Sequence, residues 1–213
     1  ILVCLVGSEM CIRDRHASMP NYPERGDVAK ANAMLDEAGF KKNSEGVRLT
    51  GVLDLIPYGE DWRRAGEYLK QVMGDIGIDL ELRYEDVPTW LKRIYHRYDF
   101  QMNVNYFYQL PDPVLGVHRH YGTDQIRKGT HFVNSSRYSN PTLDALLDSG
   151  AGEPDAAKRT AAYNEIQQIL ANDMPVVNLF ELEFLVVYNT KLKGAYGSAM
   201  GAYGSFREAY LDD

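Results

Sequence analysis

The chain has 213 residues, 45% of them hydrophobic and 25% charged, which are values typical of a globular protein. Its formal net charge is −7, and no run of Lys and Arg longer than two occurs. A sequence-independent nucleic-acid binder needs a basic face, so we expect no nucleic-acid partner.

The first 15 residues, ILVCLVGSEMCIRDR, hold both cysteines of the chain. A signal peptide has its basic residues before the apolar run, whereas here they follow it, and the run is too short for a membrane helix. A strand over ILVCLV would lack a partner of its own. The stretch from about Leu5 to Arg15 resembles the translated transposon-end adapter of a sequencing library. We therefore interpret 1–15 as an adapter artefact without native structure, and the rest of the chain contains no cysteine for a disulfide or a thiolate metal site.

Hydrophobic periodicity then predicts alternating helices and strands. The expected elements are a helix capped by Asp27 and stopped at Gly39, a strand over 47–56, a helix over 60–77, a strand over 78–86, a helix with Pro88 at its first position, and a strand over 99–107. This alternation is typical of a mainly parallel α/β sheet, in which ligands bind beyond the carboxyl ends of the strands. The loop over 108–122, after the third strand, is therefore the first place to expect function.

The second half of the chain has stronger helix signals. Asn140 followed by Pro141 predicts one helix start, and Asp155 caps a second, longer helix. Two short strands are expected at about 176–180 and 183–189. The last 20 residues read as a loop with a short helical end over 205–211.

Five stretches, taken together and in order, resemble the extracellular solute-binding proteins of family 5, the peptide- and nickel-type receptors of ABC importers. They are AKANAMLDEAGF, YLKQVMGDIGIDLELRYEDVPTWLKRI, NYFYQLPDP, FVNSSRYSNPTLDALLD and AAYNEIQQILANDMPVVNLF, all within 27–189. Each stretch is weak alone, but the shared order makes the resemblance specific.

The resemblance implies an α/β fold of the periplasmic-binding-protein type II, a two-lobed clamshell that closes on its ligand. Residues 16–175 would form the second lobe, and 176–213 would return toward a first lobe that lies upstream of this sequence together with the export signal. The implied partners are a small solute and the transmembrane subunits of an ABC permease. The implied location is the periplasm or the cell envelope.

The resemblance also suggests binding residues in and before the loop over 108–122. In peptide receptors of the family, an Asp shortly before Pro-Asp-Pro holds the ligand's α-amine, and Gln109 stands there in this chain. A neutral amide leaves the ammonium charge uncompensated, which favours a modified peptide, a sugar or an opine-like compound, unless the register is off by one residue or Asp112 is the anchor. Tyr106 and Tyr108 lie where the family keeps a Trp near the ligand. Arg119 could pair with a ligand carboxylate or form an ordinary salt bridge.

Three histidines, His118, His120 and His131, raise the question of a metal. The first two would share a face on a strand but not on a helix, and no second shell is evident. We expect no catalytic residue, no metal ligand and no cofactor. The alternatives to a binding protein are a metal-assisted hydrolase built on these histidines with Asp112, and a ligand-sensing or chaperone protein on the same fold.

Overall fold

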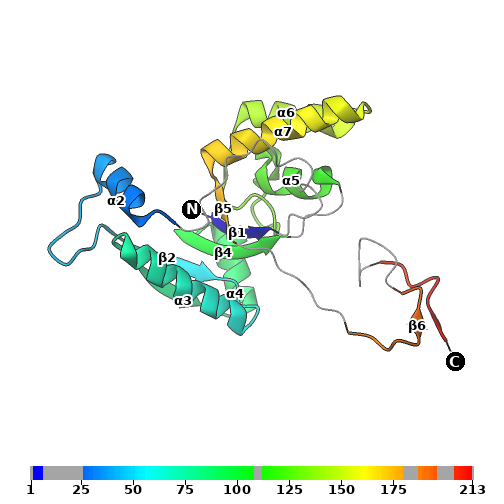
Figure 1. Ribbon diagram of the computed structural model, residues 1–213, viewed down its shortest axis with the longest axis horizontal. Helices are drawn as coiled ribbons and strands as arrows, with labels where there is room; N and C mark the ends of the chain where they lie inside the picture. Colours follow the sequence, from blue (N-terminus) through cyan, green and yellow to red (C-terminus); the bar gives the residue numbers. More distant parts are fainter. Residues whose placement is uncertain (1, 7–25, 108–111, 180–186, 196–203, 213) are drawn as a thin grey trace.

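A five-stranded parallel sheet forms the centre of the molecule (Figure 1), in a computed structural model that describes residues 2–6, 26–107, 112–179, 187–195 and 204–212. In spatial order its strands are β3 (Ile78–Tyr84), β2 (Leu49–Leu55), β4 (Met102–Phe107), β1 (Leu2–Val6) and β5 (Val176–Asn178). The parallel α/β sheet expected from the sequence is confirmed.

Helix α3 (Glu60–Asp75) covers one face of the sheet. Its buried residues Trp62 and Leu69 recur at helical spacing, and the Leu residues of β2 that face them are almost fully buried. Gly77, at φ 83°, makes the turn from α3 into β3. The predicted strand, helix and strand over 47–86 are confirmed with slightly shorter bounds.

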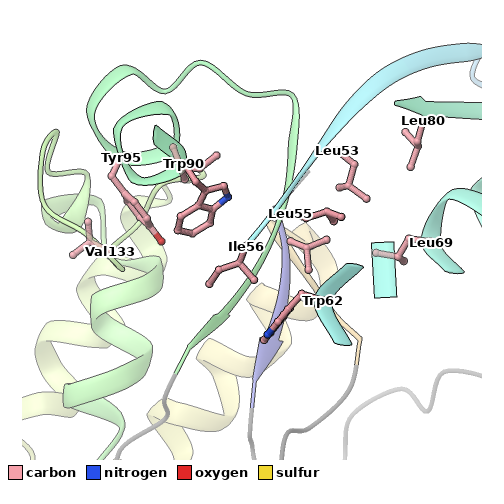
Figure 2. Close-up of a cluster of buried hydrophobic side chains, with 11 residues drawn as sticks. Leu53, Leu55, Ile56, Trp62, Leu69, Leu80, Trp90, Tyr95 and Val133 are labelled. Carbon is pink, nitrogen blue, oxygen red and sulfur yellow. The ribbon is translucent and has the colours of Figure 1, made fainter. Parts of the chain in front are cut away.

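The opposite face of the sheet packs against α4 (Val87–Leu91) and the π-helix η2 (Lys92–Arg97). Asp86 caps α4 by accepting from Thr89 N at 2.8 Å, so Pro88 occupies the second helical position and not the first. Trp90 and Tyr95 are buried in the same cluster as the leucines of β2 and β3 (Figure 2).

Asp54 of β2 lies on the α4–η2 face, because side chains alternate along a strand and its neighbours Leu53 and Leu55 pack toward α3. It is 0% exposed. Its carboxylate accepts from Arg83 Nε at 2.6 Å and Arg83 Nη2 at 2.8 Å, and Arg93 Nε lies 3.8 Å away. A buried charge requires such partners.

A second hydrophobic cluster lies beneath α5 (Pro113–Tyr121), α6 (Pro141–Gly152) and α7 (Ala156–Asp173), with a 3-10 turn at η3 (Thr123–Gln125). The predicted caps of α6 and α7 are confirmed: Asn140 accepts from the N–H groups of Thr142 and Leu143, and Asp155 accepts from two at the start of α7. Phe100 and Phe132 pack against both this cluster and the first one.

The expectation of a loop over 108–122 is wrong for Pro113–Tyr121, which form helix α5. Asp112 caps it by accepting from Val114 N, and Pro113 is its first residue. This is the same start signal that identified α6. In the stretch from 108 to 122, residues 108–111 lie outside the described part of the chain.

The chain ends differ from the sequence expectations. Leu2–Val6, expected to have no native structure and no partner, pairs as β1 with β4 and with β5. The adapter interpretation concerns the origin of the gene sequence and stays a prediction. The helical end expected over 205–211 is wrong: β7 (Tyr210–Leu211) pairs there with β6 (Leu192–Lys193), apart from the main sheet (Figure 1). Most of the strand expected at 183–189 lies outside the described residues, and 187–189 form no strand.

Helix α2 (Val28–Glu37) precedes the sheet, with Asp27 as its cap and Gly39 at φ 89° after its end, as predicted. None of its residues is buried. In the described part of the chain, every helix is too short or too polar to cross a bilayer.

Replacing Gly66 by alanine tests the packing of α3 on the sheet. A Cβ there would stand 2.5 Å from Cδ1 of the buried Leu55, so overpacking is expected to lower the free energy of unfolding by about 1–3 kcal/mol. Gly74→Ala on the same helix is the matched control, since nothing lies within 4 Å of its added Cβ, and it should stabilise by up to about 1 kcal/mol. Urea unfolding measures both, and equal effects of the two variants would contradict the packing.

Candidate functional site

Tyrosine side chains gather where the parallel strands β2, β3 and β4 end. Tyr58 follows β2, Tyr84 is the last residue of β3, and Tyr106 is the penultimate residue of β4. Because the strands are parallel and adjacent in the order β3–β2–β4, their carboxyl ends meet at one edge. This edge is where open α/β sheets bind ligands.

Tyr58, Trp62 and Tyr106 form an aromatic cluster at this edge. The ring centroids of Tyr58 and Tyr106 are 5.8 Å apart and nearly edge-on, and those of Trp62 and Tyr106 are 5.5 Å apart. Trp62 is only 7% exposed, whereas Tyr58 is 41% exposed. Trp62 is therefore the buried base of the cluster. Tyr106 packs against it and is partly exposed, and Tyr58 is open to solvent.

The protonation of Tyr58 suits a hydrogen-bonding role. Burial, and then the neighbouring Tyr106, raise the pKa of Tyr58 above its usual value. The hydroxyl stays neutral at physiological pH and can both donate and accept. Amphipathic rings of this kind offer apolar area and a polar tip together.

The turn that carries Tyr58 is held from β3. The Tyr84 hydroxyl donates to the Gly59 carbonyl at 3.1 Å, and Gly59 has φ 120°, which favours glycine. The Arg63 guanidinium lies 4.9 Å above the Tyr84 ring. Arg63 thus places an exposed positive charge at the same edge, where a ligand carboxylate would compete with Glu60, whose Oε2 lies 4.0 Å from Arg63 Nε.

The five sequence-predicted site residues have different outcomes. Tyr106 lies in the aromatic cluster. Tyr108 and Gln109 lie outside the described residues. Asp112 caps α5 and Arg119 lies on it; their partners are described next.

The Asp112 carboxylate already has a cationic partner. Its Oδ1 accepts from Val114 N at 2.9 Å and from Arg159 Nη2 at 2.7 Å. The backbone hydrogen bond, together with Arg159, lowers the pKa of Asp112. Arg119 is exposed and donates weakly to the His131 carbonyl at 3.5 Å. A ligand ammonium at Asp112 would therefore have to compete with Arg159.

The three histidines are not brought together. His118 Nε2 contacts the Tyr163 hydroxyl at 2.9 Å, and the buried His120 ring packs on Phe107 at 3.8 Å between centroids. Both lie on helix α5, two residues apart, and so point in different directions. His131 contacts a different histidine, His96. Within the described ranges, no group of three His, Cys, Asp or Glu side chains could hold a metal ion.

Sequence reasoning missed Tyr58 and treated Trp62 as a core residue only. One available signal was the rule already applied to the third strand, namely that the residues directly after a parallel strand lie at the binding edge. Applied to the first predicted strand, it selects the Pro-Tyr-Gly turn at 57–59.

Comparison with known proteins agrees with the fold. The family model described as "bacterial extracellular solute-binding proteins, family 5 Middle" matches residues 14–127, more than half of the chain. Protein XP55 of Streptomyces lividans is 29% identical over 181 residues, covering 79% of this chain and 31% of that protein. Di/tripeptide-binding protein 1 of Pseudomonas aeruginosa is 25% identical over 150 residues, covering 70% and 27% respectively.

A solved structure shares the architecture. The periplasmic binding protein DppA of Helicobacter pylori, in complex with the peptide STSA, superposes with a TM-score of 0.64 at 19% identity, covering 90% of this chain and 36% of that one. The likeness supports the periplasmic-binding-protein fold expected from the sequence. The chain spans about a third of the length of the relatives that it matches.

Proposed function

Because the chain belongs to the bacterial extracellular solute-binding proteins of family 5, we propose that it supplies one lobe of an ABC-importer receptor that captures a small organic solute. The receptor would act in the periplasm or cell envelope and deliver the solute to the permease. The observation that carries this proposal is the aromatic cluster of Tyr58, Trp62 and Tyr106 at the carboxyl edge of the sheet.

The cluster fits binding without chemistry. It offers graded exposure, a neutral tyrosine hydroxyl and the nearby cation of Arg63. A binding site needs such area with a few oriented polar groups. The competing metal-assisted hydrolase would need His118, His120 and His131 to converge, and their separate contacts speak against it.

A peptide or modified peptide is the proposed ligand class. The names of the relatives point to peptides, and Arg63 suits a carboxylate group. Gln109 in place of an acidic anchor, and Arg159 already paired with Asp112, favour a ligand whose amine is blocked. A sugar and an opine are the competing ligands in the test.

The two tryptophans of the chain permit a direct test. Trp90→Phe leaves Trp62 as the reporter at the site, and Trp62→Phe leaves the buried Trp90 as the matched control. We expect acetylated di- and tripeptides at millimolar concentration to change the fluorescence of the first variant only. Equal responses in the two variants, or no response to any peptide, sugar or opine by a chain that circular dichroism shows to be folded, would contradict the proposal.

Truncating the rings tests which of them contact the ligand. Tyr58→Ala and Tyr106→Ala should each weaken the affinity about twofold to twelvefold, because an aromatic contact contributes about 0.5–1.5 kcal/mol beyond area burial. Tyr68→Ala is the control, since Tyr68 is on the solvent side of α3 and is 65% exposed. Fluorescence titration of the Trp90→Phe background measures all three, and loss of affinity in Tyr68→Ala alone would sink the assignment.

A further inference from the structure

A pair of histidines lies outside the aromatic edge. His96 belongs to the π-helix η2, and His131 lies in the chain between η3 and α6. Their Nε2 atoms are 3.1 Å apart and their ring centroids 5.2 Å apart. Both side chains reach solvent, since neither residue is buried.

The separation of the two nitrogens suits a shared metal ion. Imidazole nitrogens bind zinc at about 2.0–2.1 Å, so two of them on one ion stand roughly 2.9–3.4 Å apart for octahedral to tetrahedral angles. The observed 3.1 Å lies in this range. Without an ion, one ring donates its Nε2 proton to the other, and either ring can be the donor.

Contacts with Tyr95 and Gly129 restrict the positions of the two rings. Gly129 N donates to the Tyr95 carbonyl at 2.8 Å, which fastens the chain before His131 to η2. The Tyr95 ring is fully buried, lies 5.8 Å from the His131 ring, and its hydroxyl accepts from Asn105 Nδ2 at 2.6 Å. Gly129 also lies near the His96 ring, since a Cβ added at Gly129 would stand 3.7 Å from the Cε1 and Nδ1 atoms of His96. These contacts reduce the ordering that ion binding would require.

Protonation does not block the His131 ring at neutral pH. Burial, and then His96, lower the pKa of His131 below its usual value, so its nitrogen lone pair is available at neutral pH. The exposed Arg119 reaches the His131 carbonyl and not the ring nitrogens.

We propose that His96 and His131 form a surface site for a divalent late first-row transition ion, Ni²⁺, Cu²⁺ or Zn²⁺, with water completing the coordination. Imidazole ligands suit these ions. Among the described residues, no carboxylate, thiolate or further imidazole joins the pair as a third ligand. The site would therefore hold an exchangeable ion and would not be a closed structural site.

Calorimetric titration of the full chain with NiCl₂ at pH 7.5 tests the site. His96→Asn and His131→Asn should each weaken binding at least tenfold, and the double variant should lose little more, because one ion uses both rings. His16→Asn, a histidine outside this pair, is the control and should leave the affinity unchanged. Unchanged affinity in both single variants, or loss in His16→Asn, would overturn the proposal.

A measurement on the unmutated chain keeps the test independent of folding defects. Substoichiometric Cu²⁺ should broaden the imidazole proton resonances of His96 and His131 before those of the other histidines. Acidification to about pH 5 should abolish this selectivity, since the ligand nitrogens must be unprotonated. Uniform broadening of all histidines at pH 7.5 would refute the site.

Discussion

Replacing Asp54 by alanine is expected to lower the free energy of unfolding by about 3–5 kcal/mol, the usual cost of removing one partner of a buried ion pair. The carboxylate is 0% exposed and holds Arg83 through two hydrogen bonds. Burial raises the pKa of Asp54, while the hydrogen bonds and charges of Arg83 and Arg93 oppose that shift. Without the carboxylate, Arg83 would lose both of these hydrogen bonds, whereas Arg93 would keep its ion pairs with Glu85 and Asp99.

Urea unfolding of Asp54→Ala measures this effect, with Asp79→Ala as the control. Asp79 is on the neighbouring strand, and its carboxylate lies 3.7 Å from Lys70 at an exposed position. An exposed pair contributes about 0–1 kcal/mol, so the control should scarcely change. Equal losses in the two variants would mean that the Asp54 network adds no more than a surface ion pair.

Acid is expected to destabilise the chain through His120. Burial, and then the nearby Arg119 charge, lower the pKa of His120 to about 3 in the folded state, against about 6.5 in an unfolded chain. The stabilisation is present above pH 6.5 and is lost as the pH falls toward 3, because only the unfolded chain binds the proton in that range. The loss approaches about 5 kcal/mol at the low end, at 1.36 kcal/mol for each pKa unit.

The difference between wild type and His120→Gln isolates this contribution. Glutamine is polar but does not titrate, so the variant should lose less stability than the wild type between pH 6.5 and 4.5, by about 2–3 kcal/mol. His16→Gln, which leaves His120 in place, should follow the wild type. Urea unfolding at several pH values gives the free energy of unfolding of each protein. Parallel pH dependences for wild type and His120→Gln would contradict the prediction, because they would show that His120 binds its proton in the folded chain as readily as in the unfolded chain.

Local signals in the sequence predicted much of the fold. Asp27, Asn140 and Asp155 cap helices where their side chains can accept from free N–H groups, and this requires only neighbouring residues. The alternation over 78–86 likewise reflects one buried and one exposed face of a strand. The helix-start signal Asp112-Pro113 was present as well, but the whole stretch was interpreted as a loop, so helix α5 was not predicted.

The candidate site required knowledge that local patterns do not contain. Tyr58 and Tyr106 are 48 positions apart in the chain and meet only because β2 and β4 are neighbours in the sheet. Arg159 reaches Asp112 from a helix that begins much later. Such contacts depend on strand order and helix docking, which a single sequence leaves undetermined.

The two hydrophobic clusters share few side chains, and this has a consequence for cooperativity. Among the described residues, Phe100 and Phe132 are the partly buried ones that pack against both clusters, and Phe132 has a positive φ of 56° that a bulky residue rarely adopts. Native-state hydrogen exchange would then report two subglobal units, one around β2 and α3 and one around α6 and α7. Besides these two phenylalanine rings, strand β4 couples the two units, because its Val104 belongs to the first cluster and its Phe107 to the second.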